Sequence, residues 1–439
     1  MLPEPVHSAL SRLNAEGFAA WLVGGCVRDR LMGITPHDYD IATAATPEET
    51  KAVFAGEKCI DTGLRHGTVT VLLSGEPIEV TTFRAEDNYS DHRHPDSVRF
   101  TRSLREDLAR RDFTVNAIAM DAGGALCDPF GGRADLENKL LRAVGDPEAR
   151  FREDALRILR CLRFAAVLGF SIEPETAKAM ERCRDLLRFV SAERICAELT
   201  KLLCGDHVRS VLTEHADVVF AVLPELASMK GFDQRNFHHI YDVLEHTARV
   251  VEQVPPEPRL RWAALFHDAG KPACFTLDAE GVGHFYGHAE QSRVLADAAF
   301  GRLKMDNATR EAADQLIRCH DWPIEATAPT VRRALRRLGP EGLNDLLALK
   351  RADNLAQNPA FQDRLQIYDG IEALAAQILE EQQAFSLKDL AVNGDDLLAI
   401  GIPSGPEMGR ILDALLEAVI NEQLPNEREA LLNEAKAIV

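Results

Sequence analysis

The spacing of apolar residues divides the chain into two parts of different character. Up to about residue 140, short apolar runs of strand type alternate with short helical segments, and three strands are expected at residues 19–23, 68–73 and 78–83. From about residue 145, apolar residues recur at the three- and four-residue spacing of amphipathic helices. The pattern predicts an α+β fold, in which an N-terminal head with a mixed sheet precedes a mostly α-helical remainder.

Local signals predict where several helices begin and end. Thr46, followed by Pro47 and then by Glu49, is a typical helix start, because Thr can cap the helix and Pro suits its first position. Leucines at helical spacing predict one long amphipathic helix over residues 151–168. A turn at residues 401–403 interrupts the acidic helical segment that begins near residue 370.

Length and composition limit the classes of protein to consider. The chain has 439 residues, which is too long for one core and predicts two to four domains. No apolar run reaches the length of a membrane span, and the N-terminus lacks a signal-peptide pattern, so we expect a cytoplasmic protein with no membrane partner. The nine cysteines include no C-x-x-C pair, so neither a zinc ribbon nor a disulfide framework is expected.

The net charge of −19 argues against a general nucleic-acid-binding protein, because neutralisation of phosphates drives most such binding. The charge is unevenly distributed along the chain. Residues 101–170 contain twelve Lys and Arg against eleven Asp and Glu, so the acidic excess lies outside this segment. Nearly all of its basic residues are arginines, which suit bidentate contacts with phosphates and base edges. We therefore expect any RNA partner to bind through a local groove.

Asp38 and Asp40 are the strongest candidates for chemistry. They lie two positions apart in a segment of strand character, and alternate side chains of a strand project from the same face. Two carboxylates held together can bind a pair of divalent cations, which stabilise the attacking and leaving oxygens of phosphoryl transfer. The alternative is a solvated pair in a turn. Glu79 is the candidate third acceptor, with a solvent-facing strand residue as its alternative.

A glycine turn and a group of arginines near this pair could hold a nucleotide. Gly25 belongs to a turn before a short helix expected at residues 26–32, whose backbone N–H groups suit a phosphate and bring Arg28 within reach. Arg111 and its neighbouring arginine could contact a triphosphate or ribose, while Asp112 fixes an arginine. Taken alone, a solvated charge cluster is the alternative for this second group.

Asp154 and Arg157 could select a base without a nucleic-acid template. Residues three apart are neighbours on a helix, so this pair can act as a unit within the expected helix. Asp accepts hydrogen bonds and Arg donates them. Cytosine and adenine present an exocyclic N–H beside a ring-nitrogen acceptor, whereas uracil and guanine present the reverse, so one such pair suits C and A alone. The alternative is an intrahelical ion pair of little energetic value.

Arg160 and Arg163 continue the same row along the expected helix. Each step of three residues turns the helix by about 60°, so the members of the row do not share one face. Arg163 therefore comes to lie nearly opposite Asp154. We expect it to meet a phosphate or a neighbouring domain rather than the base.

A second set of candidate ligands lies in the helical part of the chain. Its members occur in apolar segments of helical pattern and are His246, His267, Asp268 and Asp353. Imidazole and carboxylate groups together suit a divalent transition metal or Mg²⁺, which can activate water against a phosphate ester. His288 and His320 could supply a second metal site, and the weaker competitors are His284, Asp314 and Asp321. The alternative for each histidine is a structural place in the core.

These segments resemble two known families. The run LVGGCVRDRLMGITPHDYDIAT (22–43) resembles the signature of the class II tRNA nucleotidyltransferase and poly(A) polymerase superfamily. Further segments fit this family in order and spacing, at residues 106–121, 128–170, 191–199 and 390–432. The order of histidines and aspartates resembles the HD phosphohydrolase superfamily. The first resemblance covers most of the chain.

The resemblance implies a fold, a function and a set of partners. It implies a CCA-adding tRNA nucleotidyltransferase with an HD domain, which acts on tRNA and uses CTP, ATP and Mg²⁺ bound by Asp38 and Asp40. The nucleotide-binding positions implied or expected are Gly25, Arg28, Arg111, Asp112, Asp154, Arg157, Arg160 and Arg163. A polar loop at residues 84–99 accompanies terminal A addition in the family and favours a complete CCA enzyme.

The sequence thus predicts four parts. They are a nucleotidyltransferase head at 1–140, a helical neck with the base-selecting helix at 141–230, an HD metal-binding domain at 231–365 and a helical tRNA-binding tail at 366–439. The alternatives are a bacterial poly(A) polymerase and a specialist that adds only CC or only A. Poly(A) polymerases typically carry basic extensions, whereas this chain ends acidic. An alternative of another class is an HD phosphohydrolase with a nucleotide-sensing head.

Overall fold

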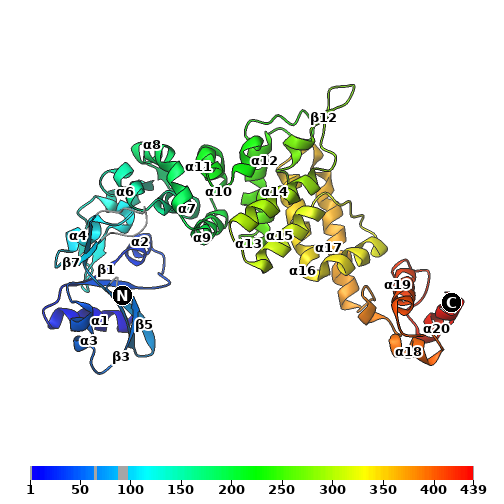
Figure 1. Ribbon diagram of the computed structural model, residues 1–439, viewed down its shortest axis with the longest axis horizontal. Helices are drawn as coiled ribbons and strands as arrows, with labels where there is room; N and C mark the ends of the chain where they lie inside the picture. The colour runs from blue at the N-terminus through cyan, green and yellow to red at the C-terminus, as the bar shows by residue number, and fades with distance from the viewer. Residues whose placement is uncertain (1, 64–66, 88–96, 439) are drawn as a thin grey trace. The chain divides into compact units, whose positions relative to one another are not determined.

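The computed structural model describes residues 2–63, 67–87 and 97–438, and the chain forms two compact units. The first unit comprises Met1–Pro224 and the second Glu225–Val439. In Figure 1, the first unit runs from blue through cyan to green and the second from green to red. The α+β fold is confirmed: a sheet with flanking helices opens the chain, and helices dominate after it.

A seven-stranded mixed sheet forms the head, in the order β3-β4-β5-β2-β1-β8-β9. Its strands are β1 Ala20–Val23, β2 Asp40–Thr43, β3 Lys58–Gly63, β4 Thr68–Leu73, β5 Glu76–Thr82, β8 Ala119–Met120 and β9 Leu126–Cys127. β2 and β5 pair in parallel, and the other neighbours pair antiparallel. β2 and β5 are distant in the sequence, but because they pair in parallel they run side by side in the same direction in the sheet.

Helices cover the sheet and continue the first unit. They are α1 Glu4–Ala15, α2 Gly25–Leu31, α3 Pro47–Val53, α4 Leu104–Ala109, α5 Gly132–Glu137, α6 Pro147–Glu153, α7 Leu156–Leu168, α8 Pro174–Cys183, α9 Ala192–Leu203, α10 Val208–Glu214 and α11 Ala216–Phe220. The predicted start of α3 is confirmed, because Thr46 and Glu49 form a reciprocal capping box. A polar loop was expected at residues 84–99. The structure has two antiparallel strands at the ends of this segment, β6 (Arg84–Asp87) and β7 (Ser97–Phe100), and residues 88–96 lie outside the described part.

Alternate residues of the strands pack on opposite faces of the sheet. Leu22 and Ile41 belong to a core with α1 and α3, whereas the next residues, Val23 and Ala42, belong to a core with α4. This alternation is the period of two expected for a strand with both faces covered. It determines which side chains of β2 and β5 reach the candidate site.

The predicted single helix over residues 151–168 is wrong. α6 ends at Glu153, α7 begins at Leu156, and Asp154 between them has an extended backbone with φ −135° and ψ 102°. The Oδ1 atom of Asp154 accepts a hydrogen bond from the Leu156 N–H at 3.1 Å. Asp competes in this way with the backbone of a helix, and therefore favours a new helix start over continuation.

The second unit is helical. It contains α12 Val243–Gln253, α13 Pro258–Phe266, α14 His288–Arg302, α15 Asn307–Cys319, α16 Ala328–Leu355, α17 Leu365–Glu380, α18 Gly394–Ala399, α19 Pro406–Ile420 and α20 Arg428–Ile438, with a short hairpin of β12 Thr276–Leu277 and β13 Gly283–His284. α16 bends at Gly339, which has φ +71° and precedes Pro340. The rings of Trp262, Phe266 and Phe300 pack together in the core of the second unit. Within the described residues, no helix is long and apolar enough to cross a membrane.

Gly132 generates a prediction about the stability of the head. A Cβ atom added there would lie 2.0 Å from the carbonyl oxygen of Thr114 and 2.9 Å from Cγ1 of Ile118. Since this contact involves backbone, the variant Gly132→Ala is expected to destabilise the region by about 2 kcal/mol or more. Hydrogen exchange in peptides that cover residues 114–137 of the full chain measures this loss of protection.

The matched control is Gly56→Ala, because a Cβ atom at Gly56 meets nothing within 4 Å. This control is expected to leave the same peptides protected and to change stability by less than about 1 kcal/mol. Equal protection in the two variants would show that the contact between α5 and the Thr114 carbonyl does not limit the packing of the head.

Candidate active site and candidate metal centre

Asp40 and Glu79 face each other on the two parallel strands of the head. Asp40 begins β2 and lies opposite Glu79 of β5 in the strand register. Ile78 and Val80 are buried in the core on the other face, so Glu79 between them points to the same side as Asp40. Asp40, Glu79 and Arg111 line one cleft of about 400 Å³. The candidate third acceptor therefore lies beside the aspartate pair.

Asp38 lies outside the strand on which the sequence placed it. It is exposed in a bend that precedes β2, so strand alternation is not what orients it. Asp38 is nevertheless near enough to act on Asp40. Partial burial of the Asp40 carboxyl, followed by repulsion from Asp38 and Glu79, raises its pKa above the ordinary value. Three carboxylates thus share one small region, where a cation would relieve their repulsion.

Asp107 orients the arginines of this cleft. It is buried on α4, and its carboxylate accepts hydrogen bonds from Arg110 at 2.8 Å and from Arg111 at 3.3 Å. Burial alone would raise the pKa of Asp107, but the two guanidinium groups outweigh it and lower the pKa. Asp107 is a site residue that was not expected from the sequence. Its spacing of three and four residues before the arginines is the signal that could have revealed it.

Gly24 permits the close approach of Arg111 to the aspartates. It has φ +76°, and a Cβ atom there would lie 3.0 Å from Nη1 of Arg111 and 3.9 Å from Oδ2 of Asp40. A side chain at this position would be strained and would also crowd the cleft. The residue expected from the sequence is the neighbouring Gly25, the first residue of α2, whereas Gly24 is the glycine that lies against Arg111 and Asp40.

Arg28 is held inside the head rather than in the lining of the cleft. It is buried, and it donates to Oδ1 of Asn116 at 2.8 Å and to Oδ1 of Asp29 at 2.6 Å. Its guanidinium also lies 5.2 Å from the centre of the Phe164 ring. Arg28 therefore joins α2 to the segment around residue 116, and the structure shows it bound to these protein groups.

Asp112 fixes an arginine, and that arginine is Arg160. Both Nε and Nη2 of Arg160 donate to Oδ2 of Asp112, at 2.9 and 2.6 Å. Burial would raise the pKa of Asp112, but the charge and hydrogen bonds of Arg160 lower it to about 2. Arg163 makes a different contact, an ion pair with Glu198 of α9 at 2.9 Å. The two arginines thus diverge, as the turn of the helix requires.

Asp154 and Arg157 line one pocket but do not form an ion pair with each other. Oδ2 of Asp154 accepts from Arg194 of α9 at 3.3 Å. Nη1 of Arg157 donates to Glu153 at 2.7 Å, and its Nη2 donates to the carbonyl oxygen of Arg110 at 2.9 Å. The pocket encloses about 250 Å³. Each candidate base-selecting group is therefore held by its own partner.

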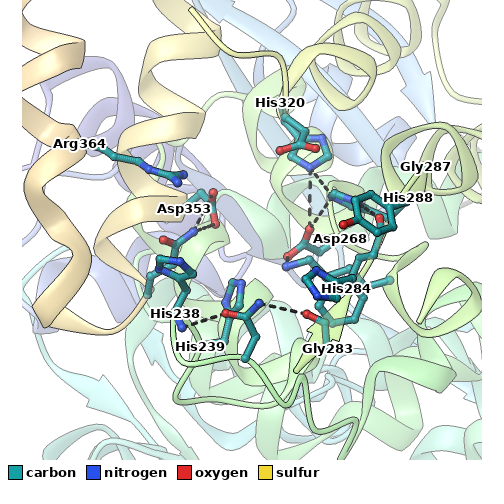
Figure 2. A pocket seen from close by; sticks show the side chains of 16 residues that line it. His238, His239, Asp268, Gly283, His284, Gly287, His288, His320, Asp353 and Arg364 are labelled. Atoms are coloured by element: carbon teal, nitrogen blue, oxygen red, sulfur yellow. Dashed lines mark hydrogen bonds and ion pairs between the residues drawn. The ribbon is translucent and has the colours of Figure 1, made fainter. Parts of the chain in front are cut away.

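Four histidines of the second unit converge on Asp268. Figure 2 shows His288 and His320 beside Asp268, with Asp353 on the other side of the cleft. The distances from Nε2 to the nearest Asp268 oxygen are 3.4 Å for His246, 3.3 Å for His267, 3.4 Å for His288 and 3.8 Å for His320. His246 also lies 3.0 Å from Asp353. The six residues predicted to bind metal ions therefore lie in one cluster: His246, His267, Asp268, His288, His320 and Asp353.

The opposite ring nitrogens are fixed by the backbone. Nδ1 lies near a carbonyl oxygen in each of the four histidines: His246 at 3.4 Å, His267 at 2.7 Å, His288 at 2.8 Å and His320 at 2.7 Å. A proton on Nδ1 leaves Nε2 as an acceptor, which is the arrangement found in metal-binding histidines. Burial, followed by the charge of His267, lowers the pKa of His320 to about 3, so its imidazole is neutral.

The residues present fit divalent metal ions. The Nε2 atoms of His246 and His267 are buried and make no hydrogen bond of good geometry, although Asp353 lies 3.0 Å from the first and Asp268 3.3 Å from the second, and this is costly unless another group binds them. The ligand atoms form two triads that share Asp268, one with His246 and His267 and the other with His288 and His320. Nitrogen and oxygen donors of this kind suit Mn²⁺, Fe²⁺, Zn²⁺ or a similar ion.

Two lysines that the sequence analysis missed support this centre. Nζ of Lys271 lies 2.6 Å from Oδ2 of Asp268, and Nζ of Lys350 donates to the carbonyl oxygen of His320 at 2.6 Å. Both lysines are buried. Lys271 follows the His-Asp pair by three residues, which is a spacing that could have marked it.

Family models match most of the chain. The poly A polymerase head domain matches residues 20–142, the probable RNA and SrmB-binding site of polymerase A matches 169–229, and the putative tRNA nucleotidyltransferase domain 2 matches 287–435. Among solved structures, the *Bacillus stearothermophilus* CCA-adding enzyme in complex with CTP is 31% identical with a TM-score of 0.72, over 100% of this chain and 98% of that one. The *Thermotoga maritima* CCA-adding enzyme complexed with tRNA, 21% identical with a TM-score of 0.60 over 100% and 96%, shares the fold.

Curated relatives named CCA-adding enzyme extend over nearly the whole sequence. The *Lactiplantibacillus plantarum* protein is 35% identical over 98% of this chain and 95% of its own length. The *Streptococcus pneumoniae* protein is 37% identical over 96% of this chain and 94% of its own length. Together with the head cleft, these relatives show that the chain belongs to the CCA-adding enzymes, the nucleotidyltransferases that complete the 3′ end of tRNA.

Proposed function

We propose that the head adds C, C and A to the 3′ end of tRNA at the cleft lined by Asp40 and Glu79, with Asp38 as a further metal ligand and with CTP and ATP as substrates. The observation that carries this site assignment is the register of β2 and β5, which sets Asp40 opposite Glu79 beside Arg111. The structure of a 31% identical relative in complex with CTP supports the choice of substrate. The full-length CCA-adding relatives also favour this activity over that of a poly(A) polymerase.

The family depends on a divalent metal ion, and we assign Mg²⁺ to this cleft. Carboxylate oxygens are the ligands that Mg²⁺ prefers, and the ion supplies charge stabilisation to the transferring phosphate when bound. Arg111, held by Asp107, donates to phosphate oxygens from the side of the cleft. A bond forms between the 3′-oxygen of tRNA and the α-phosphorus, the bond to pyrophosphate breaks, and the hydroxyl proton passes to solvent.

We assign base selection to Asp154 and Arg157. Asp154 offers acceptors to the exocyclic N–H of C or A, and Arg157 donates to the neighbouring ring nitrogen. The break between α6 and α7 places the Asp154 carboxylate in the pocket, where Arg194 holds it. Arg160, fixed by Asp112, forms another wall of the pocket, and Arg28 and Arg163 stabilise the surrounding helices. Gly25 is the first residue of α2, directly after Gly24.

We infer a second activity at the histidine centre of the second unit. The observation that favours it is the pair of buried ligand triads that share Asp268. A cleft of about 320 Å³ is lined by Asp268, His288 and His320 and also by Arg364, whose guanidinium suits a phosphate. The function that fits is HD-type phosphohydrolysis, as a phosphatase or 2′,3′-cyclic phosphodiesterase: water adds to phosphorus, and the ester oxygen leaves with a proton.

Each part of the chain expected from the sequence is assigned one activity. We propose that the head (1–140) and the neck (141–230) perform nucleotide addition, that residues 231–365 form the HD domain and that the tail (366–439) contributes to tRNA binding. A location in the cytoplasm, where tRNA is completed, is part of the same proposal. The first unit, which ends at Pro224, contains the proposed head and most of the proposed neck, and the histidine centre lies within the second unit.

The site assignment in the head predicts the effect of removing the aspartates. Asp38→Ala with Asp40→Ala is expected to reduce CCA addition at least about a thousandfold, because bound cations contribute several kcal/mol to phosphoryl transfer. The assay incubates tRNA that lacks its 3′ end with each triphosphate and sequences the products. The wild type should incorporate both C and A.

Asp61→Asn is the control, since Asp61 lies on β3 of the same sheet and pairs with Lys51 at the surface. It should retain wild-type addition. Unchanged addition by the double variant would refute the assignment, and incorporation of only one nucleotide by the wild type would identify a CC- or A-adding specialist.

Base selection by Asp154 predicts a change of specificity. In Asp154→Asn, an amide N–H can serve the carbonyl oxygen of U or G, so UTP incorporation relative to CTP is expected to rise about tenfold or more. Single-nucleotide incorporation kinetics measure the ratio. Arg152→Gln is the control, because Arg152 pairs with Glu148 on the exposed side of α6. An unchanged ratio in Asp154→Asn would assign selection to other residues.

The shared role of Asp268 predicts metal stoichiometry. In the background of the two head substitutions, the full chain equilibrated with Mn²⁺ and desalted should retain two ions. Asp268→Ala should lose both ions, and His288→Ala should lose one, because Asp268 belongs to both ligand triads. Elemental analysis measures the content. His7→Ala, at an exposed position of α1, should retain both ions, and unchanged content in Asp268→Ala would exclude this centre.

A further inference from the structure

A short segment at the rim of the histidine cleft presents side chains that the metal ligands do not use. His284, Phe285 and Tyr286 line this cleft together with His288. Phe285 anchors the segment, because its ring packs 5.7 Å from that of Phe275 and its carbonyl oxygen lies 2.8 Å from Nδ1 of His288. The segment that orients a candidate metal ligand therefore also positions the two aromatic side chains on either side of Phe285.

His284 supports Tyr286 and does not join the metal ligands. Its Nε2 atom lies 2.8 Å from Oδ2 of Asp278, and Oδ1 of Asp278 accepts from the backbone N–H groups of Glu280 and Val282. The imidazole is thus fixed by the turn of the β12–β13 hairpin. The Tyr286 ring stacks on it with centroids 5.5 Å apart and planes within 7° of parallel. Tyr286 itself is 79% exposed.

We propose that Tyr286 is a stacking surface for an unpaired nucleobase, so that the second site acts on a nucleoside phosphoester such as an RNA end. This inference rests on the phosphohydrolase activity proposed above. A flat aromatic ring that is fixed from behind and exposed in front matches the base-stacking residues of proteins that bind single strands. The same cleft is lined by Arg364, whose guanidinium suits the phosphate. Arg364 lies beside Asp353 in Figure 2, across the cleft from His284.

The geometry predicts that the site distinguishes nucleosides from other alcohols without strongly distinguishing one base from another. Stacking depends on the face of the base, which all bases have, whereas selection among bases needs hydrogen bonds to their edges. His238 is the competing platform, because its ring also lines the cleft and lies 4.4 Å from that of Phe361. His238 is half-buried, whereas Tyr286 has one face open.

The test compares two substrates with the same phosphoester. Adenosine 2′,3′-cyclic phosphate carries a base, and methyl riboside 2,3-cyclic phosphate does not. With the Mn²⁺-loaded full chain, Tyr286→Ala is expected to raise KM for the adenosine substrate about tenfold with kcat within about twofold, and to leave the base-free substrate unchanged. Tyr286→Phe retains the ring and should behave as the wild type. Phe189→Ala, at an exposed aromatic residue of the first unit, is the control.

Several outcomes would overturn the inference. Equal effects of Tyr286→Ala on both substrates, or no effect on either, would show that the ring does not bind the base. A loss of nucleoside preference in His238→Ala but not in Tyr286→Ala would transfer the role to His238.

A binding measurement separates this inference from the proposed activity. The fluorescence of 2-aminopurine riboside 2′-monophosphate should be quenched by the wild type more than by Tyr286→Ala, because stacking quenches this base. If the wild type hydrolyses neither cyclic phosphate, the phosphohydrolase proposal fails, and the quenching difference alone decides the role of Tyr286. Equal quenching by the two proteins would refute the stacking surface.

Discussion

Repulsion between like charges is the constraint on which the head depends. The parallel pairing of β2 and β5 sets Asp40 directly opposite Glu79, and Asp38 adds a third carboxylate before β2. Their mutual repulsion raises the free energy of the metal-free head and creates affinity for cations. The apolar core beneath the sheet maintains this arrangement, because Ile78 and Val80 anchor β5 on the opposite face. The free energy gained by burying this core therefore offsets the cost of holding the three carboxylates close together.

Buried aspartates orient the arginines around the head cleft and the neighbouring pocket. Asp107 holds Arg110 and Arg111, and Asp112 holds Arg160, so each guanidinium has a fixed direction before a nucleotide arrives. Preorganisation of this kind reduces the conformational entropy lost on binding. It also explains how a chain of strongly negative net charge can bind a triphosphate, since the local field of the cleft matters more than the total charge.

In the second unit, the backbone fixes the orientation of the candidate metal-binding histidines. Backbone carbonyls near Nδ1 of the histidines direct each Nε2 atom toward Asp268, so the protein determines both the ring orientation and the atom available for a metal. These carbonyls lie where helices end or begin, at the end of α13, the start of α14 and the end of α15. The last carbonyls of α13 and α15 have no partner within their helices and are available for such contacts, whereas the Phe285 carbonyl before α14 also accepts from the His288 N–H.

The sequence by itself determined the α+β class, the mixed head, the start of α3 and the two sets of candidate ligands, because period, capping and residue chemistry are local properties. It could not reveal the break at Asp154, since the apolar period of residues 151–168 continues on both sides of it. It also could not show that Arg157 pairs with Glu153, or that His284 supports Tyr286. Those choices depend on which of several nearby partners the packed chain brings within reach, and only the tertiary structure decides that.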